Sequence, residues 1–351
     1  MEKPPVARRS APPPSEPAAG TFRPCPGAIE GNRSFRDPRP GRIRTKIPLR
    51  PLKQKLFIFL RWAAVLLIFI FLGKKVIADW QSVQQYEWKI NYFWLGFSLL
   101  ILLGNFVYLS WVWSEILKIF GKSLKLKKAF KISYLSNLAR YLPGRIWQYV
   151  SLVTMCEREG ISKSTSTASF VLSQLINIPA ALLLILATGV LPAVTRQEWI
   201  KDTIWILGGA VTFGALVVIT QPNLTEKTLR WLLHKLEKTE PVLALKKTSL
   251  AGIFTSYVFG WFLHGTAFFF FTVAVTGEVG NFFPVVGAYV AAYLIGYLSF
   301  FTPGGLGVRE AVLALILSIY FPDSVAILIS TLSRLWVVLG ETAGALVAWK
   351  L

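Results

Sequence analysis

The stretch LARYLPGRIWQY (residues 138–149) places a Pro-Gly pair between two arginines, Arg140 and Arg145, in an otherwise apolar region. A second apolar stretch, LSFFTPGGLGVREAVLAL (residues 298–315), contains Pro303-Gly304-Gly305. Proline removes a backbone hydrogen-bond donor and clashes with the preceding turn, so neither stretch forms one straight helix. In a membrane protein, such breaks persist only where protein or a water-filled cavity satisfies the exposed backbone groups.

The composition of the chain is that of an integral membrane protein. Of its 351 residues, 54% are hydrophobic and only 16% are charged, which is too apolar for a soluble domain of this size. The formal net charge is +20, and the basic residues fall mainly in short loops and in the N-terminal segment. This distribution is typical of topology signals and of contact with anionic lipids, so we predict no nucleic-acid partner.

The sequence lacks the motifs of catalytic and metal-binding sites. Its two cysteines, Cys25 and Cys156, lie far apart, and its two histidines are His234 and His264. The sequence contains neither HExxH nor GxSxG. We therefore predict no catalytic residue, no metal site and no cofactor. An enzyme that acts on lipid phosphates inside the membrane is the alternative class.

Residues 1–55 are predicted to form a disordered, basic, proline-rich cytoplasmic arm. The first 50 residues hold 11 of the 20 prolines, and they carry 11 Lys or Arg against 4 Asp or Glu. Such a segment cannot bury enough apolar surface to fold. Its length and the lack of a cleavage pattern indicate an uncleaved anchor rather than a signal peptide. Residues 56–351 form the predicted polytopic membrane domain.

Six apolar runs have about the ~20 residues that a helix needs to cross a ~30 Å hydrocarbon core. They are residues 56–72, 92–113, 167–191, 203–220, 250–276 and 324–348. Two further apolar stretches, 129–156 and 284–320, are the ones cut by Pro-Gly. The predicted fold class is an all-α integral membrane protein with six full transmembrane helices and two re-entrant hairpins that have Pro-Gly at their tips.

The charges of the loops predict the orientation of the chain. Segments 118–128 and 221–249 are strongly basic, whereas 192–202 and 277–283 are not, so the positive-inside rule places the basic segments in the cytoplasm. Six spans fit these sides only if each hairpin returns to the side it entered from, the first from the cytoplasm and the second from outside. Both termini then lie in the cytoplasm, and the predicted localisation is the cell membrane.

The two halves of the chain resemble each other. Pro143-Gly144 and Pro303-Gly304 are 160 residues apart, and the spans flanking them keep nearly the same offset. Each predicted repeat, about residues 56–191 and 203–350, has three full spans, so the second copy is inverted relative to the first. Inverted repeats with paired broken helices are common in transporters, and the breaks mark the binding site. We therefore expect the two breaks to meet near the middle of the membrane.

NLARYLPGRIWQ (137–148) and the stretch 298–315 closely resemble the two signature stretches of the flippase-like membrane family, typified by the transmembrane part of lysylphosphatidylglycerol synthase. The resemblance covers about residues 55–350 and implies movement of a lipid between leaflets. The full synthase carries a soluble aminoacyl-transferase domain after its membrane part, whereas this chain ends at Leu351. The resemblance therefore supports translocation and gives no support to lipid aminoacylation.

The predicted partner is a membrane lipid with an anionic or zwitterionic head that contains phosphate. Helix N-termini and arginines bind phosphate, so we expect the arginines beside the breaks to hold it, while the glycines let the backbone approach or flex. Structural anchoring is the alternative role for the first two arginines. The predicted binding residues are Arg140, Pro143, Gly144, Arg145, Pro303, Gly304, Gly305, Gly307 and Arg309.

Three further charged residues predict a network in the membrane. On the most lenient insertion scale, a charged residue at the bilayer centre costs ~2.5–3.5 kcal/mol of insertion free energy. Each such residue therefore needs an oppositely charged partner or contact with water. Glu310 follows Arg309 directly and faces another direction, while Arg334 and Glu341 are two turns apart on one helix face. We expect Arg334 to neutralise Glu310 or Glu341. The network is either structural or part of gating and head-group binding.

Two further candidates are Gln174 and Asn177, which either line the cavity or form hydrogen bonds to neighbouring helices. Asn105 and His264 are single polar residues within spans, and we expect them to have a packing role. A polyprenyl-phosphate-linked glycan lipid fits the same chemistry as a phospholipid. A non-catalytic accessory subunit is the remaining class. The sequence does not indicate an oligomeric state.

Overall fold

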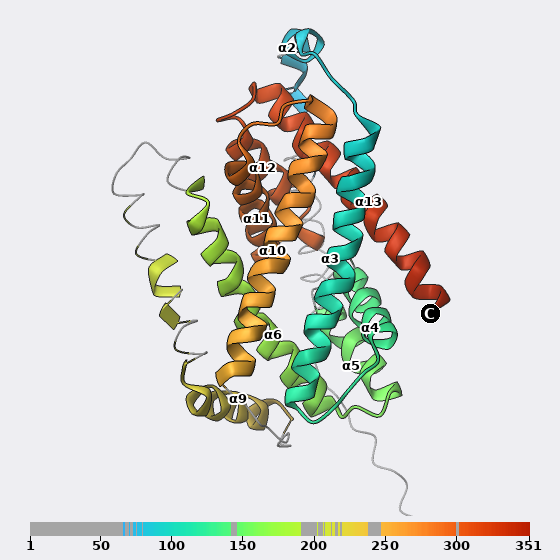
Figure 1. Cartoon of the computed structure of the whole chain (residues 1–351), viewed down its shortest axis with the longest axis vertical. Coiled ribbons are helices and arrows are strands. Elements are labelled where there is room, and N and C mark those ends of the chain that lie inside the picture. Colours follow the sequence, from blue (N-terminus) through green and yellow to red (C-terminus); the bar gives the residue numbers. More distant parts are fainter. Residues whose placement is uncertain are drawn as a thin grey trace, which may run out of the picture. The chain divides into compact units, whose positions relative to one another are not determined.

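The computed structural model of the protein describes residues 80–141, 146–190, 220–237, 247–299 and 302–351, together with single positions between 66 and 78 and between 202 and 217. All regular elements in these residues are helices (Figure 1). The all-α prediction is therefore confirmed for the described part of the chain. The predicted arm, most of the predicted span 56–72 and half of the predicted span 203–220 lie outside it.

Four described helices are long and apolar enough to cross a membrane. They are α3 (Tyr92–Ile119), α6 (Lys163–Ala187), α10 (Lys247–Thr276) and α13 (Asp323–Lys350). At 1.5 Å per residue, a helix of 28 residues such as α3 extends about 42 Å, which exceeds the ~30 Å of a hydrocarbon core. These helices correspond to four of the six predicted spans and confirm those four.

Side chains and a glycine fix the ends of these helices. Asn91 Oδ1 accepts a hydrogen bond from the Phe93 backbone N–H at 3.0 Å, and Ser162 Oγ accepts one from the Thr165 N–H at 3.2 Å. These caps satisfy donors that lack a partner in the first turns of α3 and α6. Helix α10 is followed by Gly277, whose φ of 75° is the left-handed conformation that ends many helices.

Both apolar stretches with Pro-Gly form pairs of short helices. The first helix pair is α4 (Leu126–Leu138) and α5 (Ile146–Arg158), with the short 3₁₀ helix η1 (Ala139–Tyr141) after α4. The second helix pair is α11 (Phe282–Leu298) and α12 (Val308–Leu317), with the 3₁₀ helix η2 (Pro303–Gly305) between them. Thirteen residues of α4 extend about 20 Å, which is less than a hydrocarbon core.

Glycine is required at the second break. Gly304, Gly305 and Gly307 have φ values of 58°, 73° and 81°, which side chains strongly disfavour. A Cβ on Gly305 would also lie only 2.7 Å from the carbonyl oxygen of Gly296 in α11. The break can therefore fold tightly against its own first helix only with glycine at this position.

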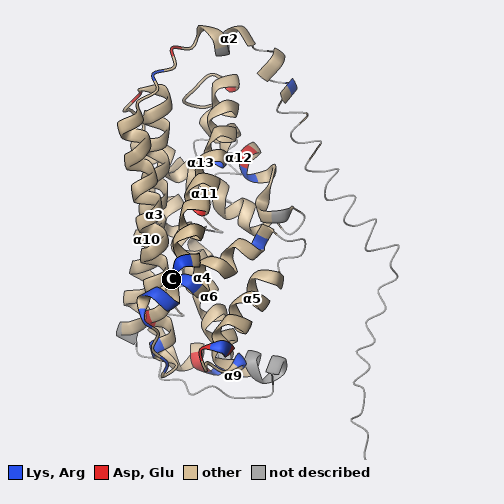
Figure 2. Ribbon diagram, turned by 90° about the vertical axis from the view of Figure 1, so that its right-hand side faces the viewer, with Lys and Arg blue, Asp and Glu red and all other residues tan. Residues whose placement is uncertain are grey.

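Helices α3 and α10 pack along each other, and the two helix pairs lie toward opposite ends of them (Figures 1 and 2). The first helix pair shares its end with α9 (Pro222–Glu237), whereas α2 (Trp80–Gln85) lies at the other end (Figure 1). Each helix pair also packs against α6 and α13, directly or through one of its members. The described elements thus bring residues of both breaks to the same region between the long helices.

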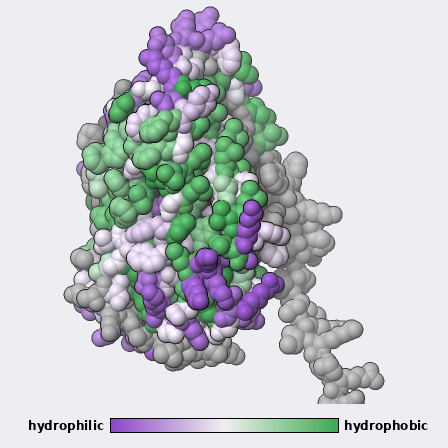
Figure 3. Space-filling view, turned by 45° about the vertical axis from the view of Figure 1, so that its right-hand side comes forward, coloured by the Kyte–Doolittle hydropathy of each residue, from purple (hydrophilic) through white to green (hydrophobic). Residues whose placement is uncertain are grey.

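The surface of the described helices suits a lipid environment. Large apolar side chains stay exposed along the long helices, including Phe93 at 71%, Leu335 at 60% and Leu346 at 63%. Figure 3 shows hydrophobic residues across the middle of one face, with hydrophilic residues toward both ends. Exposed apolar surface on this scale marks a membrane or partner contact, and the span lengths identify the membrane.

Lysines and arginines gather at the end of the molecule where α9 and the first helix pair lie (Figure 2). They include Lys118, Lys122, Lys125, Lys127, Lys128, Arg158, Lys163, Lys227 and Arg230. The basic loops predicted from the sequence therefore share one end of the described structure.

Candidate functional site

The described residues of the two breaks are in contact, since η1 packs against η2. A Cβ on Gly304 would lie 3.0 Å from two ring carbons of Tyr141. The predicted binding residues Pro143, Gly144 and Arg145 lie outside the described residues. The site is therefore built here from the flanking residues of the first break and from the second break.

Glu341 of α13 holds the end of the first break. Its Oε1 forms an ion pair with Arg140 Nη2, and its Oε2 accepts a hydrogen bond from the Tyr141 hydroxyl at 2.7 Å. The Glu341 backbone carbonyl accepts a third bond, from the Tyr134 hydroxyl of α4, at 2.7 Å. Because Glu341 is 5% exposed, the bonds from Arg140 and Tyr141 replace the water that the carboxylate loses on burial.

Arg140 has two further partners beyond Glu341. Its Nη1 donates to the Tyr293 hydroxyl at 2.9 Å and to Asn137 Oδ1 at 3.2 Å. Arg140 was predicted either to contact phosphate or to anchor the break. The structure gives it an anchoring contact and also places it on the wall of a cavity.

Glu310 opens helix α12 and stabilises its first turn. Its Oε2 accepts a hydrogen bond from the Gly307 N–H at 2.7 Å, where the helix dipole favours a negative charge. Its Oε1 lies 3.8 Å from Arg334 Nε, at ion-pair distance but without a hydrogen bond. Of the two carboxylates expected as partners of Arg334, the structure places Glu310 nearer, while Arg334 also lies over the Tyr141 ring.

Arg309 is buried without a carboxylate partner. It is 4% exposed, and its Nη2 donates to the Tyr289 hydroxyl at 2.6 Å. Its guanidinium carbon lies 4.8 Å and 4.6 Å from the ring centres of Tyr289 and Tyr293. Among the described residues, no carboxylate oxygen lies within 4.0 Å of it. Aromatic faces offset part of the desolvation of this cation but do not replace a direct ion pair.

A cavity of about 290 Å³ joins these groups, and we call it the arginine cavity. Its described lining includes three arginines and the glycine of the second break: Arg140, Arg309, Arg334 and Gly304. The surrounding cluster holds these three arginines and two glutamates, Glu310 and Glu341, so one positive charge is in excess among the described residues.

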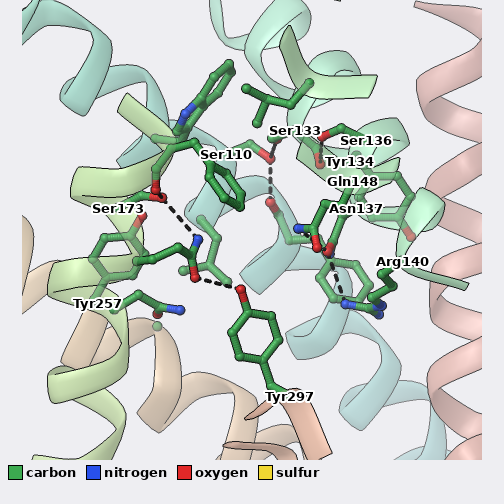
Figure 4. Close-up of a pocket in the computed structure, with 18 of the residues that line it drawn as sticks. Ser110, Ser133, Tyr134, Ser136, Asn137, Arg140, Gln148, Ser173, Tyr257 and Tyr297 are labelled. Carbon is green, nitrogen blue, oxygen red and sulfur yellow. Dashed lines mark hydrogen bonds between the residues drawn. The ribbon is translucent and has the colours of Figure 1, made fainter. Parts of the chain in front are cut away.

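A second cavity of about 190 Å³, which we call the hydroxyl cavity, lies beside the first. The two share the lining residues Arg140, Gln148, Phe170, Tyr293 and Tyr297. Figure 4 shows hydroxyl and carboxamide side chains from several helices facing one another across this space. The predicted cavity candidates Gln174 and Asn177 line it, as does His264, which the sequence suggested for packing.

The tyrosines of this site were not predicted, although the sequence held a signal for them. Tyr289, Tyr293 and Tyr297 recur every four residues along α11 and so share one helix face. The serines of the hydroxyl cavity gave no such signal, because serine in a membrane helix commonly bonds to its own backbone, as Ser136 and Ser173 do here.

Comparison with curated proteins and with solved structures gave no match. The family model described as the lysylphosphatidylglycerol synthase TM region matches residues 56–342, which include both helix pairs and all the described charges of the site. The chain therefore belongs to the lysylphosphatidylglycerol synthase transmembrane-region family.

Proposed function

We propose that this membrane protein moves a phosphate-containing lipid from one leaflet to the other, with the phosphate held in the arginine cavity. The observation that carries the proposal is Arg309, a buried cation without a carboxylate partner among the described residues, in a cavity that also contacts the second break. The family is named for the membrane part of an enzyme whose product is a lipid, which supports a lipid as substrate.

Electrostatics favour an anion in this cavity. A buried charge without a partner costs several kcal/mol, and tyrosine faces recover only part of that. A lipid phosphate would neutralise the excess positive charge of the described cluster. Arginine binds phosphate through two parallel N–H donors, and Arg309 has one nitrogen engaged by Tyr289. Its remaining donors have no hydrogen-bonded acceptor among the described side chains.

The short helix pairs support a re-entrant arrangement. Neither α4 nor α5 is long enough to cross the hydrocarbon core, and the two helix pairs lie toward opposite ends of α3 and α10 (Figure 1). We propose that the first helix pair enters from the cytoplasm and the second from outside, with six full spans and both termini in the cytoplasm. The basic residues at the α9 end support this orientation.

Cysteine labelling tests the orientation. Gly280 lies in the short connection before α11 and has open space around its Cα, so Gly280→Cys is structurally neutral. The reagent is expected to reach this cysteine only from outside, and a cysteine at Lys122 only from the cytoplasm. Labelling of both positions from the same side would contradict the inverted arrangement.

Reconstituted vesicles test the function. Purified protein would be placed in liposomes with a fluorescent phospholipid, and the fraction of probe accessible to an external quencher would be followed over time. We expect transport by the natural chain and a loss of most of it in Arg309→Gln. The matched control is Arg158→Gln, because Arg158 is exposed at the end of α5. Equal transport by all three proteins would exclude Arg309 from the substrate site.

A further inference from the structure

The hydroxyl cavity adjoins the arginine cavity, and the phosphate site proposed above leaves most of its polar lining without an assigned function. The two cavities share the lining residues Arg140 and Tyr293. When the phosphate of a lipid lies near Arg309, the rest of its head group can therefore extend into the hydroxyl cavity. Taken together, their volumes fall in the ~300–1,000 Å³ range typical of small-molecule sites. We infer that the hydroxyl cavity is the head-group subsite and takes an uncharged polyhydroxylated head, such as glycerol, inositol or a sugar. This inference rests on the proposed function.

The polar groups of the hydroxyl cavity are a mixture of donors and acceptors. Asn137 and Asn177 use their amide oxygens to accept bonds, from Arg140 and Trp261 respectively, which leaves both amide nitrogens as donors. Gln148 donates to Asn137 through its nitrogen, which leaves its oxygen as an acceptor. A hydroxyl both donates and accepts, so hydroxyl groups of a ligand match this set.

The serines extend the same pattern. Ser133 donates to the Ser110 oxygen at 2.8 Å, and Ser136 donates to the Ser133 backbone carbonyl at 3.0 Å. The Ser136 oxygen therefore keeps its lone pairs for an acceptor role. Because these hydroxyls come from α3 and α4, the polar lining of the cavity is not confined to α10 and α11.

Trp113 adds a buried donor without a partner. The residue is 5% exposed and lines the hydroxyl cavity, yet its indole N–H forms no hydrogen bond with any described group. A buried donor without a partner costs about 1–3 kcal/mol, which a protein rarely carries without an acceptor from ligand or water. A ligand hydroxyl supplies such an acceptor.

A cationic head does not suit this cavity. Its described lining contains no Asp or Glu to pair with a cation, and its one arginine, Arg140, already occupies the nearby Glu341. An ammonium group only donates, so it would leave the donors of Asn137, Asn177 and Trp113 without acceptors. Aromatic cages bind quaternary ammonium groups, but here His264 stacks on Trp261 and Arg309 covers Tyr293.

Lipid binding by the full chain in detergent tests the inference. The probes are phosphatidylglycerol, phosphatidylinositol, phosphatidylethanolamine and phosphatidic acid with identical short acyl chains, and isothermal titration calorimetry measures each dissociation constant. We expect the two polyol lipids to bind about ten-fold or more tightly than the other two, since each extra hydrogen bond contributes about two- to ten-fold.

Trp113→Phe is the decisive variant, because it removes the donor and keeps an aromatic ring. It is expected to weaken phosphatidylglycerol binding by about two- to ten-fold and to leave phosphatidic acid binding unchanged. Trp111→Phe on the same helix is the matched control, since Trp111 is 42% exposed and does not line the hydroxyl cavity.

The outcomes separate this inference from the proposed function. Equal affinity for all four lipids, each lost in Arg309→Gln, would overturn the head-group inference and leave the phosphate site standing. Tighter binding of phosphatidylethanolamine than of phosphatidylglycerol would also overturn it. Binding that is unaffected by Arg309→Gln, or no binding of any of the lipids, would overturn the proposed function itself.

Discussion

Removal of Arg140 is expected to destabilise the protein by stranding Glu341. In Arg140→Gln, the Glu341 carboxylate keeps the Tyr141 hydroxyl but loses its cation at a position where its side chain is 7% exposed. Breaking one side of a buried ion pair costs about 3–5 kcal/mol. At about 2 °C per kcal/mol for a chain of this size, the apparent melting temperature falls by roughly 6–10 °C.

The double variant Arg140→Gln with Glu341→Gln distinguishes pairing from simple loss of contacts. Two neutral side chains leave no charge stranded, so most of the lost stability is expected to return. A thermal-shift series in detergent measures the natural chain, both single variants and the double variant. The control is Lys118→Gln, whose partner Glu115 is exposed enough that the change stays within about 0.5 kcal/mol. Losses that simply add in the double variant would refute the pairing.

Three further variants test packing and strain around the site. Gly305→Ala is expected to lower the melting temperature and transport together, because the new Cβ meets the Gly296 carbonyl and φ is 73°, whereas Gly252→Ala, with open space around it, changes neither. Asn105→Leu is expected to keep or raise the melting temperature, since both amide atoms of this fully buried residue lack a partner among the described groups; a clear loss of stability would contradict this expectation. Tyr293→Phe keeps the ring beside Arg309 and removes one hydrogen bond of Arg140. It is expected to lower the free energy of unfolding by about 0.5–1.5 kcal/mol, seen as a small drop in melting temperature, without abolishing lipid binding.

The breaks and four of the spans were predictable because their causes are local. Proline and glycine change the backbone within one helical turn, and a transmembrane span is defined by the hydropathy of ~20 consecutive residues. Breaks and spans can therefore be predicted without knowledge of tertiary contacts. The pairing of charges was not predictable in this way. Arg140 and Glu341 are 201 residues apart, and only the packing of α4 and η1 against α13 brings them together.

The sequence predicted either Glu310 or Glu341 as the carboxylate partner of Arg334, and the geometry of the site identifies which one it is. Arg334 and Glu341 lie on one face of α13, but Arg140 and Tyr141 already occupy both oxygens of Glu341. Arg334 is therefore left with Glu310 from the neighbouring α12. Arg140, which takes Glu341 from Arg334, was predicted to contact phosphate or to anchor the break, and Glu341 was not among its expected partners.

Helix α13 links both breaks through these charges. Glu341 binds Arg140 and Tyr141 at the first break, while Arg334 pairs with Glu310, the third residue of the helix that follows the second break. Movement of one helix pair relative to the other must therefore separate at least one charged contact of α13. In the proposed transport cycle, a phosphate in the arginine cavity lies beside Arg140 and competes with Glu341 for the same guanidinium. Since a ligand shifts a conformational equilibrium only by its differential affinity for the two states, this competition gives the lipid a physical means of favouring separation of the breaks.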